Sequence, residues 1–195
     1  MAKFEGTWFS VDVESNGPII GRNQMMSFGA ISIHQNLELG EAFWRNLNHD
    51  IAFADEETLK FWEQHAEAYN YTKSNCVDVY EAMYQFNEYI KRHKPPYCFV
   101  AKPTWYDYSW IRYHFLIAGL ADPFEMKVMD YKQHAYALKI MISKKYKERN
   151  PMQHIAINDA VEQAGEFIEF MHLSERQKTY IRPLREKEKE KTKNV

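Results

Sequence analysis

The chain has 195 residues, of which 45% are hydrophobic and 15% aromatic, and its formal net charge at pH 7 is −2. This length and composition are typical of one globular domain and exclude an intrinsically disordered chain. The charge excludes a strongly basic protein that coats duplex nucleic acid. It leaves a nuclease open, because carboxylates that bind metal ions lower the formal charge.

No stretch approaches the roughly 20 consecutive apolar residues of a membrane span, so we expect no membrane partner. The first residues, MAKFEGTWFS, lack the basic flank and apolar run of a signal peptide. The only cysteines, Cys76 and Cys98, form no C-x-x-C pair, which argues against a disulfide framework or a thiolate zinc site. These features favour a cytoplasmic location.

The first quarter of the chain predicts three strands with short connections, over residues 7–14, 25–33 and 42–47. In the first strand apolar and polar residues alternate, which places Asp12 and Glu14 on the same face. The short connections favour an antiparallel meander.

Asp55 is a predicted N-cap, because two glutamates follow it, and its helix is expected to run to about Tyr69. The remaining predicted elements are a helix over 77–93, a strand over 97–101, a helix over 107–118, a strand over 127–129 and a helix over 155–171. Three strands followed by alternating helices and strands predict an α/β fold, a mixed β-sheet flanked by helices.

We expect a single domain over residues 1–182 and a charged C-terminal tail over 183–195. The tail sequence after Pro183, LREKEKEKTKNV, has no apolar face, which is typical of a solvated tail or a frayed helix. A nucleic-acid tether is the alternative, although the interleaved glutamates lower its net charge.

Asp12 and Glu14 are the first candidate site residues. Two carboxylates on one strand face repel each other and resist burial, which raises their pKa values. A divalent cation removes that penalty, and oxygen ligands suit magnesium or manganese. D-x-E is nevertheless a common pattern, and a strand with one polar surface face would also explain it.

Asp107, Asp159 and His154 are the other candidates. Asp107 follows the strand YCFVA through KPTWY, and an acidic residue beyond a strand end is where α/β sheets often bind ligands; an N-cap is the structural alternative. His154 and Asp159 form an H-x-x-x-x-D pattern at the start of the last helix. Without a ligand, Asp159 would simply favour the helix dipole and His154 would be a loop residue.

Taken together and in this order, these residues resemble the signature of the DEDDh 3′-to-5′ exonucleases, a branch of the ribonuclease-H-like nucleases that includes proofreading exonucleases, ribonuclease T and oligoribonuclease. The resemblance covers residues 7–171. Four blocks are similar to stand-alone bacterial and phage members: VDVESNGPIIGRNQMMSFGAISI, ETLKFWEQHAEAY, FVAKPTWYDYSWIRYHF and HIAINDAVEQA. One stretch departs from the pattern: Asp107 follows A-K-P-T-W-Y, where many relatives carry a small polar or glycine-containing stretch and then Phe-Asp.

The resemblance implies a ribonuclease-H-like fold and two magnesium or manganese ions. Asp12 would bridge both ions. Glu14 and Asp159 would bind the ion that activates water, and Asp107 the ion near the leaving oxygen. His154 would be the general base, and the product a nucleoside 5′-monophosphate.

The implied partner is the 3′ end of a single-stranded nucleic acid. The resemblance also places the backbone around Asn16, Gly17 and Pro18 and the side chain of Met25 near the terminal nucleotide. Of Phe61 and Trp62, which follow each other on one helix, we expect Phe61 in the core and Trp62 free to stack on a base. Many relatives dimerise, so a homodimer is allowed, although no feature of this sequence demands one.

Two alternatives remain at this point. The first is a catalytically inactive nucleic-acid-binding protein with the same fold, which the presence of all five signature residues disfavours. The second is a hydrolase that uses paired carboxylates without a metal, whose activity would survive chelation. No residue reports on recognition of a 2′-hydroxyl, so RNA and DNA are both open.

Overall fold

The computed structural model describes residues 4–193 of the chain, and the side chains as far as residue 177. Its centre is a five-stranded sheet in the order β3-β2-β1-β4-β5. The strands are β1 Thr7–Ser15, β2 Met25–Ile33, β3 Leu39–Asn46, β4 Tyr97–Ala101 and β5 Val128–Asp130. β1, β2 and β3 pair antiparallel, whereas β4 and β5 run parallel to β1. The expected mixed sheet, with its antiparallel meander, is confirmed.

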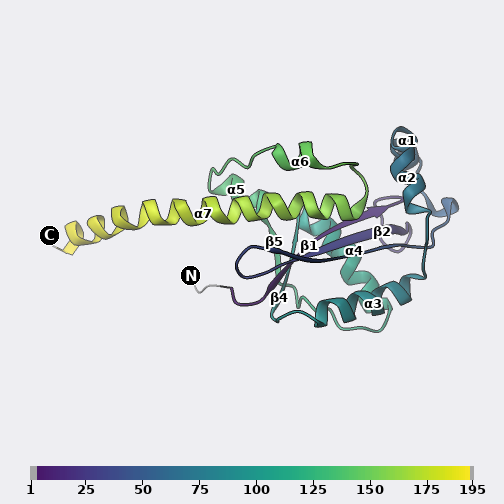
Figure 1. The fold of residues 1–195 in the computed structure, drawn as a ribbon, viewed down its shortest axis with the longest axis horizontal. Helices are drawn as coiled ribbons and strands as arrows, with labels where there is room; N and C mark the ends of the chain where they lie inside the picture. Colours follow the sequence, from purple (N-terminus) through teal and green to yellow (C-terminus); the bar gives the residue numbers. More distant parts are fainter. Residues whose placement is uncertain (1–3, 194–195) are drawn as a thin grey trace.

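Helices cover both faces of this sheet, as Figure 1 shows for α7 on one side and α3 and α4 on the other. The helices are η1 Ile51–Phe53, α1 Glu56–Gln64, α2 Ala66–Thr72, α3 Val79–Lys91, α4 Thr104–Ile117, α5 Tyr131–Ala137, α6 Lys145–Arg149 and α7 Ala156–Lys193. The two largest apolar clusters lie on opposite sides of the sheet. One contains Phe9, Phe28, Phe86 and Trp110, and the other contains Trp8, Val100 and Phe167.

The alternation of β1 divides its side chains between these layers. Phe9 and Val11 belong to the core cluster that includes residues of α3 and α4, and Trp8 belongs to the cluster that includes residues of α7. Asp12 and Glu14 therefore lie on the α7 side, near the end of the strand. The parallel pairing of β1 with β4 ends at Ser10, so the last residues of β1 extend past β4.

Three predicted helices differ from the observed ones. The helix predicted from Asp55 to Tyr69 is two helices, because the backbone of His65 leaves the helical conformation (φ −121°, ψ 42°). α4 begins at Thr104, so Asp107 lies in its first turn and is not an N-cap. α7 continues past Met171 to Lys193. The predicted N-cap role of Asp55 is confirmed, since its side chain accepts a hydrogen bond from the Thr58 amide.

Among the residues that the structure describes, no helix combines the length and the apolar character needed to cross a membrane.

Candidate active site

The four predicted acids come from three elements that meet at one end of β1. Asp12 and Glu14 lie on β1, Asp107 in the first turn of α4, and Asp159 in the first turn of α7. His154 lies two residues before α7 begins. The fold therefore brings together all five residues that the sequence singled out.

Asp107 is fixed to β1 by a backbone hydrogen bond. Its Oδ1 accepts from the Val13 amide at 3.0 Å, and its side chain is almost completely buried. Because the pairing of β1 with β4 ends at Ser10, β4 does not reach the level of Val13. The first turn of α4 occupies this position. The Asp107 carboxylate is therefore bound at Val13, the residue between Asp12 and Glu14 in β1.

Gly29 allows α7 to approach β1. It is paired with Asp12 across the sheet, and a Cβ at this position would lie 2.4 Å from the Ile157 amide nitrogen. A side chain at residue 29 would therefore displace the start of α7. Further along the helix, the Ser10 hydroxyl donates to the Ala160 carbonyl at 2.8 Å. This close contact is what brings Asp159 to the carboxylates of β1.

Asp159 also organises the turn before α7. Its Oδ2 accepts from the His154 amide at 2.8 Å, and its Oδ1 accepts from the side chain of Asn150. His154 has φ +64°, a left-handed conformation that non-glycine residues adopt infrequently and that often marks functional sites. Asp159 therefore has a structural role at the start of α7. The same turn also brings Asp159 and His154 close to Glu14.

Ionisation of all these carboxyl groups together is unfavourable in the absence of a cation. Burial, and then repulsion from Asp107 and Glu14, raise the pKa of Asp12 well above its ordinary value. Burial, and then Asp159, do the same to the pKa of Glu14. Burial raises the pKa of Asp107 to about 8, against the hydrogen bonds that lower it. One ligand atom each from Glu14, His154 and Asp159 lie within 4.8 Å of one another. The carboxylate oxygens of Glu14 and Asp159 are donors that suit a divalent metal ion, and the His154 ring lies beside them.

Gln163 positions Asp12, a role that the sequence analysis missed. Its Nε2 donates to Asp12 Oδ1 at 2.6 Å, and its Oε1 accepts from the Lys102 amide at 2.9 Å. Gln163 is buried and lies four residues after Asp159, one turn along the same helix face. That spacing is the signal by which the sequence could have identified it.

Lys102, in the stretch that departs from the family pattern, joins β4 to α7. Its Nζ contacts Glu162 Oε1 at 3.0 Å and Glu166 Oε2 at 2.7 Å. Glu166 also accepts from the Tyr131 hydroxyl at 2.6 Å. The unusual lysine is therefore compensated by two glutamates of α7. No sequence signal linked these positions, because they lie about 60 residues apart.

The His154 ring is packed among other rings. Its centroid lies 4.3 Å from that of His65 and 4.9 Å from that of Phe61. Burial, and then the positive charge of His65, lower the pKa of His154. The imidazole is therefore neutral at a lower pH than a free histidine, as a proton acceptor requires.

A pocket of about 360 Å³ adjoins Glu14. Phe61 and Trp62 line it from α1, opposite Gly17 and Tyr106. The expected orientation of the two aromatic residues is wrong. Phe61 is 37% exposed, whereas Trp62 is 2% exposed and donates from Nε1 to the Ser15 carbonyl at 3.1 Å. Adjacent side chains on a helix differ in direction by only about 100°, so the sequence alone did not decide which of the two rings would be exposed.

One further expectation requires correction. Met25 is 2% exposed and belongs to the main core cluster, so its side chain does not face the pocket. Alternation along β2 directs Met26 toward Trp62 instead. The Asn16 side chain is held by the loop, since its Nδ2 donates to the Asp50 carbonyl and its Oδ1 accepts from the Gln24 amide, and a role of the Asn16 backbone stays a prediction. Gly17, in contrast, lines the pocket as expected.

Comparison with known proteins supports the resemblance. The family model described as "3′-5′ exoribonuclease Rv2179c-like domain" matches residues 7–171. The 3′-5′ DNA exonuclease Cap18 of Escherichia coli is 27% identical over 183 residues, which cover 87% of this chain and 94% of that protein.

Solved structures share the fold at low sequence identity. The nuclease domain of 3′hExo, a DEDDh family member solved with rAMP, superposes with a TM-score of 0.59 at 12% identity, over 85% of this chain and 92% of that one. Pop2p of S. pombe, solved in a form with Mg²⁺ and Mn²⁺, gives 0.62 at 11% identity, over 83% and 81%. The expected ribonuclease-H-like fold and the resemblance to DEDDh exonucleases are confirmed.

Proposed function

The chain belongs to the family of 3′-5′ exoribonuclease Rv2179c-like domains, and from this premise we propose that it removes nucleoside 5′-monophosphates from the 3′ end of single-stranded nucleic acid. The observation that carries the proposal is the convergence of four acids and His154 from three elements beside a pocket of nucleotide size. These acids raise one another's pKa values, which is a cost that a catalytic metal site repays.

Asp12, Glu14, Asp107 and Asp159 would hold two magnesium or manganese ions. When bound, the ions supply positive charge to the phosphate and make water more acidic. The chain itself contributes rigid positions: the Val13 amide holds Asp107, Gln163 holds Asp12, and the His154 amide holds Asp159. Such prior fixation reduces the reorganisation needed at the moment of reaction.

His154 accepts the proton of the attacking water at an imidazole nitrogen. Its lowered pKa keeps the ring neutral at neutral pH. His65 and Phe61 restrict the ring on one side, and the turn held by Asp159 places it over the acids. General base catalysis of this kind contributes typically 10²–10⁴-fold.

The pocket beside Glu14 would receive the terminal nucleoside. Phe61 offers the exposed ring for base stacking, a contact that contributes about 1–3 kcal/mol per base. Trp62 supports the pocket wall through its bond to Ser15. Gly17 and Pro18 also line this pocket. A side chain at residue 17 would collide with Asn23, so the loop requires a glycine there.

The test is release of mononucleotides from single-stranded RNA and DNA by purified protein with magnesium or manganese, analysed by chromatography. We expect 5′-monophosphates, and none after chelation. Activity that survives chelation would support a metal-free hydrolase, and binding without any hydrolysis would support an inactive nucleic-acid-binding protein. Either result would refute the proposal.

Both polymers are included because the relatives differ. The family description names an exoribonuclease, whereas Cap18 is described as a DNA exonuclease. The homodimer and the cytoplasmic location stay predictions.

A further inference from the structure

A short basic segment lies beside the acids without being part of the proposed catalytic set. We call residues 143–150, SKKYKERN, the basic strap; it contains α6 and carries four basic residues and one acidic residue. In Figure 1 the strap lies along α7, on the side away from the sheet. For a chain with a net charge of −2, this is a local concentration of positive charge.

The strap is fixed to α7 at both ends and at its middle. The Ser143 amide donates to Glu169 at 3.2 Å, and Lys145 pairs with the same glutamate. The Tyr146 ring lies against Gly165, where a Cβ would come within 2.3 Å of the ring. At the far end, the Asn150 side chain donates to the site acid Asp159. The position of the strap is therefore coupled to that of the acids.

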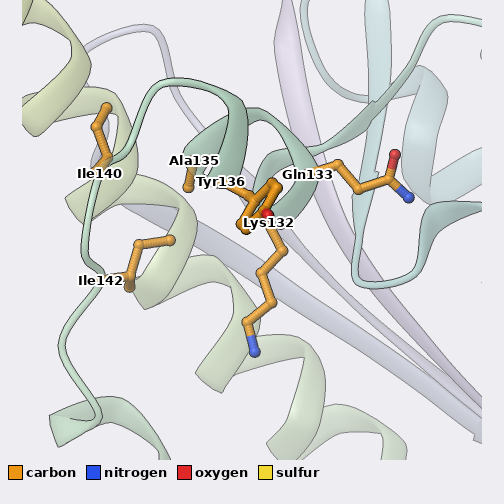
Figure 2. Close-up of a pocket in the computed structure, with 6 residues that line it drawn as sticks. All are labelled: Lys132, Gln133, Ala135, Tyr136, Ile140 and Ile142. Carbon is orange, nitrogen blue, oxygen red and sulfur yellow. The ribbon is translucent and has the colours of Figure 1, made fainter.

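These anchors leave two lysines directed at the site. Lys144 and Lys147 are three residues apart and share a helix face. They line a pocket of about 490 Å³ together with Asp12, His154 and Asp159. Lys132 of α5 also lines it, and Figure 2 shows its side chain extending from α5 away from Gln133. Within the part of the chain whose side chains are described, these three lysines form no ion pair.

Lys102 lines the same pocket but is not equivalent to them. Its ammonium is already paired with Glu162 and Glu166 and is largely buried. The three other lysines are exposed and can bind an anion without leaving a buried carboxylate unpaired. They are suited to a multiply anionic ligand that extends out of the site.

The two pockets lie next to different acids. Glu14 borders the pocket with Phe61, whereas Asp12 and Asp159 border the pocket with the lysines. We propose that the basic strap binds the phosphodiester backbone on the 5′ side of the scissile bond, with Lys144 and Lys147 each contacting a phosphate and Lys132 assisting them. This rests on the proposed function, since it assumes that the terminal nucleoside occupies the pocket beside Glu14.

A backbone contact of this kind has a measurable salt dependence. Each phosphate neutralised on a single strand contributes about −0.7 to the slope of log affinity against log salt concentration. Removal of two contacts should therefore flatten the slope by about 1.4, which corresponds to roughly tenfold weaker binding near physiological salt.

The test compares the double variant Lys144→Gln/Lys147→Gln with Arg149→Gln. Arg149 is an exposed basic residue of the same strap that does not line the pocket and is not one of the anchors to α7, so it is a matched control. Two substrates are used: an oligothymidylate strand of about ten nucleotides, and the p-nitrophenyl ester of thymidine 5′-monophosphate, which has no upstream phosphate. Binding of the strand is measured separately by fluorescence anisotropy in an Asp12→Asn background, which prevents cleavage.

We expect the double variant to lose about tenfold in kcat/KM on the strand through KM, to show the flatter salt slope, and to keep its rate on the ester. Arg149→Gln should behave as wild type on both substrates. Unchanged binding in the double variant, equal losses on strand and ester, or an equal loss in Arg149→Gln would overturn the inference. If wild-type protein hydrolyses neither substrate but the double variant still binds the strand more weakly, the proposed function fails and the basic strap stands.

Discussion

The carboxyl group of Asp107 makes the stability of the metal-free protein depend on pH. Burial raises the pKa of Asp107 to about 8, whereas an unfolded aspartate titrates near 3.9. Between these values the folded protein binds a proton that the unfolded chain has lost. The free energy of unfolding therefore falls as pH rises through this window, and a bound cation should oppose the loss.

We predict that Asp12→Ala, Glu14→Ala, Asp107→Ala and Asp159→Ala each lose nearly all nuclease activity while remaining folded. Asp12→Asn keeps an acceptor for Gln163 and removes one buried negative charge, so its Tm in a chelator above pH 8 should exceed that of wild type. Manganese should raise the Tm of wild type and have much less effect on Asp12→Asn. Thermal scans with and without manganese measure both effects.

The loss of activity in the alanine variants is measured with the nuclease assay. Full activity of purified Asp12→Ala would refute the site.

His154 should govern the acid side of the pH profile. We predict that His154→Ala lowers the single-turnover rate by about 10²–10⁴-fold while the strand still binds. In wild type, the rate should rise with pH as the ring loses its proton and reach its plateau below the pH expected for a free histidine, because the pKa of His154 is lowered. An unchanged rate and pH profile in His154→Ala would remove this residue from the mechanism.

His65 provides a separate test of that electrostatic environment. Burial and the positive charge of His65 both lower the pKa of His154, so His65→Gln should move the acid limb of the rate profile to higher pH. His134→Gln, on the exposed side of α5, is the matched control and should leave the profile unchanged. The measurement is kcat/KM across pH for the three proteins; coincident profiles for wild type and His65→Gln would contradict the expected influence of His65.

The helix α7 continues well beyond the part that packs on the sheet. Its described apolar contacts with the sheet involve residues up to Met171, where the family match also ends. We predict that a chain ending at Arg182 keeps its Tm and its rate on a mononucleotide ester. Unchanged cleavage of long strands would favour a solvated segment, whereas a selective loss on long strands would favour the nucleic-acid tether. A large fall in Tm would show that the domain boundary at residue 182 is wrong.

The strands were more predictable than the helix ends. The predicted bounds of β2 and β4 agree with the observed ones, because apolar alternation or a short apolar run reports directly on a sheet. The break between α1 and α2 occurs at His65, where no glycine or proline marks it. α7 continues through a segment with no apolar pattern, but glutamate and lysine are good helix formers and stabilise helices through i,i+4 pairs.

The residues of the candidate site were predictable, but the contacts that hold them in place were not. Asp12, Glu14, Asp107, Asp159 and His154 follow from the family signature, and the fold brings them together. The bond from Val13 to Asp107 depends on β4 ending before β1, which is a property of the sheet. The role of Gly29 could be predicted only by knowing that α7 crosses β2 at this residue. The exposure of Phe61 depended on how α1 lies over the site.

At the scale of the whole molecule, the acids lie between an aromatic pocket and a basic one. Glu14 and Phe61 border the first, and Asp12 and Lys147 border the second. A linear strand with its 3′ end in the aromatic pocket would place the next phosphates near the basic strap. This arrangement favours an enzyme that starts at a 3′ end, with the terminal nucleoside against the residues of α1 and Gly17 that line the aromatic pocket.

The direction of digestion therefore decides whether the chain is a 3′-to-5′ exonuclease. Single strands labelled at the 5′ end are incubated with magnesium or manganese, beside strands blocked by a 3′-phosphate and circular single strands. We expect a descending ladder from the 5′-labelled strand, poor digestion of the blocked strand, and no product from the circle. Efficient cutting of the circular strand, or release of the 5′ label as the first mononucleotide, would contradict it.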